Sequence, residues 1–169
     1  MVLKVLKKAG LTSSDVKLVD MSQSAAAVAF AKGKIAAWAN WDPYTAQAEL
    51  KYGGLMIVNG SDVNVTNRDY LLSGKYAGNH KSATKLLIKY LGKDMTWAKT
   101  HKTALISMMS KELKLSKAII ARQVNRRSFA MHAVDSTQVA EEQAIADLFY
   151  QQGVIKKTID VSKYVLNLK

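Results

Sequence analysis

Cysteine is absent from this chain of 169 residues, proline occurs once, and 13 acidic side chains stand against 25 basic ones. The lack of cysteine excludes disulfides, thiolate metal sites and cysteine nucleophiles. No apolar run approaches the ~20 residues that a membrane-spanning helix needs, so we expect no membrane insertion of this chain, and no signal-peptide pattern opens it. A composition of 49% hydrophobic and 22% charged residues is typical of a globular protein with one domain or two small lobes.

The net charge of +12 is concentrated in one segment. Residues 71–127 carry thirteen Lys and Arg against two Asp and Glu, whereas residues 1–70 carry eight against six and residues 128–169 carry four against five. Such a segment indicates either a nucleic-acid footprint or the solvated face of helices. The basic residues recur at every fourth position of one predicted helix, with apolar residues opposite, which favours the solvated face.

The first third of the chain alternates strand-like and helical runs. Short β-like runs begin near Val16, Ile35 and Leu55, and a helical run separates each pair, an interval that fits a strand, a helix and two turns. We therefore predict an α/β fold with a parallel β-α-β-α-β unit. Either Ser22 or Ser24 is the expected cap of the first helix, and Gly33, and Gly53 with Gly54, stand where left-handed helix ends belong.

The stretch "IAAWANWDPYTAQAEL", residues 35–50, is predicted to be a strand-to-helix junction. Asp42 suits the N-cap, and Pro43 suits the first helical position because it has no amide to leave unpaired. In open α/β sheets this edge binds ligands. Strand alternation places Trp38 in the core, whereas Trp41, the last residue before the cap, is open to either role.

The remainder of the chain is predicted to be mainly helical. Residues 63–73 form an extended linker, and helices follow in residues 79–101, 115–129 and 135–153. Ser116 caps the second of these helices, and Asp135 with Gln138 forms a capping box at the third. The third helix is expected to turn the following residues inward: Ala140, Ala144, Ile145, Leu148 and Phe149.

No catalytic constellation is present in the sequence. His80, His101 and His132 are far apart and lie near no paired acids, and no glycine-rich phosphate loop occurs. We therefore expect no enzyme activity, no cofactor and no metal.

Three blocks resemble a known family. "KAGLTSSDVKLVDMSQSAAAVAFAKGKIAAWANWDPYTAQAE", "TNRDYLLSGKYAGNH" and "AEEQAIADLFYQQGVIKKTIDVSKYV" are similar, in this order, to the solute-binding proteins of ABC importers for aliphatic sulfonates, taurine and nitrate. The resemblance spans almost the whole chain and corresponds to the C-terminal half of such a protein.

The resemblance implies a partial, two-lobed fold of the periplasmic-binding-protein type. Residues 1–66 would belong to the second α/β lobe, residues 67–74 would cross between the lobes, and residues 75–169 would be the helical C-terminal part of the first lobe. A main anion contact of the family, a Ser/Thr-bearing turn, would precede residue 1. The partners implied are a small organic anion and ABC permease subunits, and the full-length protein would be periplasmic or extracellular and membrane-anchored. Separately, the apolar helix faces, if exposed, could make a homodimer.

The same resemblance implies the ligand-binding residues. Trp41, Asn67 and Arg68 match family residues at the cleft, and the Arg68 guanidinium is a suitable fork for a sulfonate. Asp42 and Tyr44 match the "AWANWDPY" motif and have either a binding or a structural role. Arg127 comes from "NRRSFAMH", which is similar to a family loop that faces the cleft. The ligand-binding residues that the resemblance implies are therefore Trp41, Asn67, Arg68, Asp42, Tyr44 and Arg127.

The alternative is a basic, helical nucleic-acid-associated protein or the effector domain of a regulator. It depends on the positive segment, in which Arg122, Arg126 and Arg127 could form a recognition helix. Aromatic residues are not interleaved with these charges as they are in a base-stacking platform, so no nucleic-acid partner is expected.

Overall fold

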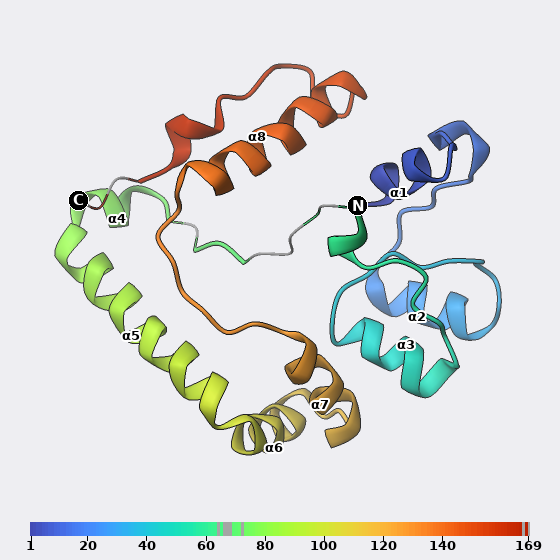
Figure 1. Ribbon diagram of the computed structural model, residues 1–169, viewed down its shortest axis with the longest axis horizontal. Coiled ribbons are helices and arrows are strands. Elements are labelled where there is room, and N and C mark those ends of the chain that lie inside the picture. Colours follow the sequence, from blue (N-terminus) through green and yellow to red (C-terminus); the bar gives the residue numbers. More distant parts are fainter. Residues whose placement is uncertain (64, 66–68, 72, 167, 169) are drawn as a thin grey trace. The chain divides into compact units, whose positions relative to one another are not determined.

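The computed structural model describes residues 1–63, 65, 69–71, 73–166 and 168. It contains two compact units, one made of residues 1–70 and 101–128 and the other of residues 71–100 and 129–169. Figure 1 shows the helices of both units along the chain. The elements of the first unit are α1 (Val2–Lys8), η1 (Ser13–Asp15), α2 (Gln23–Ala31), α3 (Tyr44–Tyr52), η2 (Gly60–Val63), α6 (Lys102–Leu113) and α7 (Lys117–Arg126). Those of the second are α4 (Lys75–Asn79), α5 (Lys81–Thr100), α8 (Ser136–Gln151) and η3 (Val161–Tyr164).

The helix starts follow the local signals of the sequence. The hydroxyl of Ser22 accepts the amide of Ala25 at 3.3 Å to begin α2, and Ser116 accepts the amide of Ile119 at 3.4 Å to begin α7. These side chains satisfy amides that have no partner inside the helix. Ser22 is therefore the cap of the two serines predicted for α2, and the predicted cap Ser116 is confirmed.

The capping box of α8 is also confirmed. The Asp135 carboxylate accepts the amides of Thr137 at 2.7 Å and Gln138 at 3.3 Å, and the Gln138 side-chain oxygen accepts the Asp135 amide at 2.8 Å. At the other end of a helix, Gly53 terminates α3 in the left-handed region, with φ of 69°. A residue with a Cβ would be strained in that conformation.

The start of α3 differs from the prediction by one residue. Pro43 occupies the N-cap position, and Asp42 precedes it. The Asp42 carboxylate nevertheless accepts the Ala46 amide at 3.1 Å, so it caps the helix from one position further back. Asp42 was predicted as the N-cap itself, which was wrong in position and right in the bond that it makes.

The predicted β-α-β-α-β unit is not confirmed. The two expected helices form, but no described residue of the segments 16–21, 34–39 and 55–59 is assigned to a strand. A strand is defined by backbone pairing with a neighbour, which an apolar sequence run alone does not supply. Leu55 is 89% exposed and Ile57 is 81% exposed, so the third segment has its apolar side chains in solvent.

The core of the first unit lies where α3 packs against α2 and α7. Four alanines of α2 and α3 bring the helix backbones close together, and larger residues of α6 and α7 complete the core. The buried apolar residues of these helices are Ala26, Ala27, Ala46, Ala48, Leu105, Ile119, Ile120 and Val124.

The second unit covers much less apolar surface. Among its described residues, only Ala77 and Ala98 are buried apolar side chains. The inward face predicted for α8 was wrong, because α8 has no buried residue and Ile145 and Phe149 are 39% and 41% exposed. A helix buries its apolar stripe only where another element packs on it.

The segment after α8 folds back along this helix and is held there by the side-chain amide of Gln143. The Gln143 Nε2 group donates to the carbonyl of Ile159 at 2.7 Å, and its Oε1 accepts the amide of Val161 at 2.9 Å. These bonds hold η3 beside α8. Within the described residues, none of the helices combines the length and apolar character needed to cross a lipid bilayer.

Candidate functional site

An aromatic cluster surrounds the start of α3. The Trp38 ring lies 5.9 Å from that of Phe30 and 6.0 Å from that of Tyr44, measured between centroids. Trp41 meets Tyr44 edge to face at 6.2 Å, an arrangement that aromatic pairs favour. Trp38 is half-buried, whereas 55% of Trp41 is exposed. We call Trp41 and Tyr44 the aromatic wall. The Trp38 ring also contacts Tyr44, and the Trp41 ring is exposed to solvent.

The backbone before α3 is fixed by polar bonds as well as by rings. The hydroxyl of Thr45 donates to the side-chain oxygen of Asn40, and the Asp42 carboxylate holds the amide of Ala46, which is fully buried. Asn40 and Asp42 lie on either side of Trp41. Both sequence neighbours of Trp41 are therefore fixed by hydrogen bonds to the first turn of α3.

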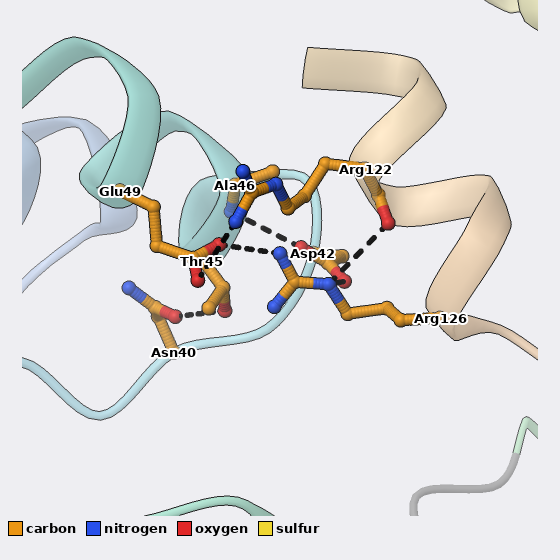
Figure 2. Close-up of polar contacts among 7 residues, drawn as sticks. All are labelled: Asn40, Asp42, Thr45, Ala46, Glu49, Arg122 and Arg126. Atoms are coloured by element: carbon orange, nitrogen blue, oxygen red, sulfur yellow. Dashed lines mark hydrogen bonds and ion pairs between the residues drawn. The ribbon is translucent and has the colours of Figure 1, made fainter. Parts of the chain in front are cut away.

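Two arginines of α7 pair with carboxylates on and before α3 (Figure 2). The Arg126 Nε lies 3.4 Å from the Asp42 Oδ2, and its Nη2 forms an ion pair with the Glu49 Oε2. The Arg122 Nη1 lies 3.5 Å from the other Glu49 oxygen. Arg122, Arg126, Asp42 and Glu49 balance in formal charge, and we call them the α3–α7 clamp.

An open hollow of about 580 Å³ adjoins the clamp within the first unit. Its lining combines three clamp residues with two amide side chains and a thioether: Glu49, Arg122, Arg126, Asn59, Asn125 and Met56. The Asn59 side-chain oxygen accepts the amides of Ser61 at 2.9 Å and Asp62 at 3.3 Å.

The six sequence-predicted site residues fall into three groups. Trp41, Asp42 and Tyr44 lie together at the start of α3. Arg127 follows α7 and forms an ion pair with Asp69, and its side chain is 48% exposed. Asn67 and Arg68 lie outside the described residues, so their part in the site stays a prediction.

Sequence reasoning missed Glu49 and the pairing of the α7 arginines. The basic residues of this helix were interpreted as a solvated face, yet Arg126 is paired at two points and its side chain is 27% exposed. The sequence did contain a signal for this pairing. Arg122 and Arg126 are one turn apart, and they share a helix face with Ile119, which is buried. Within the described parts of the chain, no group of three or more His, Asp or Glu could hold a metal ion.

Known proteins share sequence with this chain. Residues 1–105 match the family described as NMT1/THI5 like. The aliphatic sulfonates-binding protein of Escherichia coli K12 is 26% identical over 166 residues, covering 98% of this chain and 52% of the relative. The corresponding protein of Bacillus subtilis 168 is 26% identical over 154 residues, covering 90% and 46%.

Two solved structures share the fold. The periplasmic aliphatic sulphonate binding protein SsuA from E. coli matches with a TM-score of 0.89 and 26% identity, covering 98% of this chain and 54% of that one. The alkanesulfonate-binding protein SsuA from Xanthomonas axonopodis pv. citri, bound to MOPS, matches with a TM-score of 0.89 and 27% identity, covering 98% and 57%. The chain thus spans about half the length of the relatives that it matches.

Proposed function

Because the chain belongs to the NMT1/THI5-like family, we propose that it binds a small organic anion such as an aliphatic sulfonate, as part of an extracytoplasmic solute-binding protein of an ABC importer. The observation that carries this proposal is the match of nearly the whole chain to two sulfonate-binding proteins, one of them bound to the sulfonate MOPS. Both are named as binding proteins, which supports a role in binding rather than in catalysis.

The aromatic wall suits the apolar part of such a ligand. An organic sulfonate has an apolar chain and a charged head, and small-molecule sites combine apolar surface with a few placed polar groups. The exposed ring of Trp41 would contact the chain, while Asn67 and Arg68 would bind the head, with Arg68 as a bidentate donor.

The clamp removes an objection to an anion at this position. An unpaired Asp42 would repel a sulfonate, but its carboxylate lies 3.4 Å from the Arg126 guanidinium and also accepts the amide of Ala46. One guanidinium and one backbone amide of the first helical turn therefore share its charge. We assign to Asp42 a structural role and to Tyr44 the support of Trp41, while Arg127, paired with Asp69, would contact the ligand only after exchanging that partner.

The wider assembly follows from the same proposal. Permease subunits would receive the loaded receptor. Residues 1–66 would belong to one lobe, and residues 67–74 would cross. The resemblance placed all of residues 75–169 in the other lobe, but residues 101–128 share a compact unit with residues 1–70, so we place only residues 75–100 and 129–169 there. The exposed apolar side chains of α5 and α8, among them Leu86, Leu87 and Phe149, offer a surface for a second copy of the chain. Light scattering tests this homodimer, which a clean monomer across a hundredfold range of concentration would contradict.

The nucleic-acid alternative loses support from the clamp. All three arginines that could form a recognition helix are paired with carboxylates, so they would have to break these pairs to bind phosphate. DNA affinity that falls steeply with salt would favour the alternative over the receptor.

Calorimetric titration with MOPS, short alkanesulfonates, taurine and nitrate at matched ionic strength tests the proposed function. We expect binding of sulfonates and a ligand-dependent rise in the unfolding midpoint. Trp41→Leu and Arg68→Gln should each weaken binding at least about tenfold, whereas Trp97→Leu, in the other unit, is the matched control and should not. Equal responses to sulfonates and chloride would contradict the proposal.

A further inference from the structure

The two oxygens of Asp42 have different partners. Oδ1 accepts the Ala46 amide at 3.1 Å and so fixes the first turn of α3. Oδ2 lies 3.4 Å from the Arg126 Nε. The carboxylate therefore cannot turn to improve one contact without disturbing the other, and its orientation depends on where α7 holds Arg126.

Arg126 is itself held at several points. Its Nε also donates to the carbonyl of Arg122 one turn back, at 3.4 Å, and its Nη2 pairs with Glu49 (Figure 2). The backbone that carries it is anchored in the core, because Val124 is 1% exposed and Ile120 is fully buried. Arg126 thus joins a rigid part of the first unit to the junction before α3.

The exposed ring of the aromatic wall depends on this junction. Trp41 directly precedes Asp42, and its ring is positioned by the edge-to-face contact with Tyr44, the first residue of α3. A change in the Asp42 side chain would alter both the backbone next to Trp41 and the first turn that carries Tyr44. We propose that Arg126 is a positioning residue, which acts through Asp42 to hold the Trp41 and Tyr44 rings in the orientation that binds the apolar part of the ligand.

Arginine is the residue that this arrangement requires. Its planar guanidinium presents Nε and Nη2 on one edge, so one side chain reaches Asp42 and Glu49 at the same time. A lysine would offer a single charged nitrogen and could not keep both contacts in the same geometry. The proposal rests on the proposed function for its ligand, but the orientation of Trp41 is measurable without one.

The first experiment is ¹⁹F NMR of the full chain labelled with 5-fluorotryptophan. The three tryptophans give three signals, and Trp41→Phe and Trp97→Phe assign two of them. We expect Arg126→Met to shift or broaden the Trp41 signal and to leave that of Trp97 in place. Arg122→Met is the matched control, because it removes a contact with Glu49 and none with Asp42, and it should leave the Trp41 signal unchanged. Asp42→Asn added to Arg126→Met should change the signal little further.

A Trp41 signal that is identical in the wild type and in folded Arg126→Met would overturn the proposal, and so would an equal shift in Arg122→Met. Circular dichroism establishes that each variant is folded. If Arg126→Met does not fold, Arg126→Lys provides the measurement, and a displaced Trp41 signal is again required.

The second experiment measures affinity for MOPS by calorimetry in the same variants. We expect the dissociation constant to rise about five- to tenfold in Arg126→Met and to change less than about twofold in Arg122→Met. If Arg126→Met displaces the Trp41 signal but leaves the dissociation constant unchanged, the claim that this orientation affects ligand binding is contradicted. Failure of the wild type to bind would instead contradict the proposed function, while the ¹⁹F result would still decide whether Arg126 positions Trp41.

Discussion

The α3–α7 region and the helices of the second unit differ in how far their apolar side chains are covered. Ala46 and Ile120 are fully buried and Val124 nearly so, whereas Leu86 and Tyr90 of α5 are 53% and 54% exposed. The amphipathic pattern of α5 is stronger than that of α3, yet α3 has buried residues on its packed face and most of the apolar face of α5 is exposed. The difference teaches that the pattern decides whether a helix forms, while a packing partner decides whether its apolar face contributes to stability.

Local bonds hold α8 and η3 of the second unit together. The capping box of Asp135 and Gln138 starts α8, and the Gln143 side chain ties η3 to the same helix. Each of these bonds spans a short stretch of chain. We therefore expect the first unit to be sensitive to changes of volume and the second to changes of polar groups.

The largest expected effect comes from Ile120→Ala. Removing a fully buried side chain loses its transfer free energy and leaves a cavity, so the free energy of unfolding should fall by about 2–4 kcal/mol. Leu86→Ala is the matched control in the second unit and should change stability by no more than about 0.5 kcal/mol. Urea titrations followed by circular dichroism measure both, and equal losses would contradict the comparison.

Glu49→Gln should have a smaller effect. The carboxylate faces two guanidiniums, but the Arg122 and Arg126 side chains are 46% and 27% exposed, so water weakens the attraction. We expect a loss of about 1 kcal/mol at low salt that shrinks at ~1 M NaCl. Glu112→Gln on α6 is the control, because Glu112 forms no ion pair within the described part of the chain. Loss of stability that is independent of salt would show that packing, and not charge, is responsible.

The helix ends were predictable from sequence because their bonds are local. Ser22, Ser116 and Asp135 bond to amides two or three residues away, so the residues that decide the outcome stand side by side in the sequence. Composition alone also excluded cysteine chemistry. The position of Asp42 was predicted to within one residue for the same reason.

Contacts between distant segments could not be predicted in this way. Arg126 and Glu49 are 77 residues apart, and the sequence of neither helix predicts that it packs against the other. The strand prediction was not confirmed because a strand needs a paired neighbour, and an apolar run such as that around Ile57 specifies only a preference. For Asn67 and Arg68 the sequence resemblance remains the only source of their predicted role.

Gln123→Met should stabilise the first unit slightly. Gln123 is 4% exposed, and its side-chain oxygen has no hydrogen-bond partner among the described residues. Burial of an unsatisfied carbonyl costs free energy, and methionine has a similar volume without that group. We expect a gain of about 0.5–1 kcal/mol in urea titrations. Gln123→Glu, which buries a charge in the same place, should destabilise the unit, and a gain from both variants would contradict this explanation.

The smallest expected effect is the pH dependence at the α8 capping box. The backbone amides of Thr137 and Gln138 hold the pKa of Asp135 below its usual value, because they bond to the charged carboxylate. The lowered pKa in the folded state means that this stabilisation is present above the unfolded pKa, about 3.9, and is lost as the pH falls through the folded value.

Asp135→Asn keeps an oxygen acceptor and removes the titration. Since the pKa values of Asp15 and Asp160 are also lowered, the informative quantity is the difference between the wild type and Asp135→Asn in amide exchange over the first turn of α8. That difference should be largest near neutral pH and should shrink as the pH falls below the unfolded pKa of about 3.9, whereas a difference that does not depend on pH would mean that the geometry of the acceptor, and not its charge, stabilises α8.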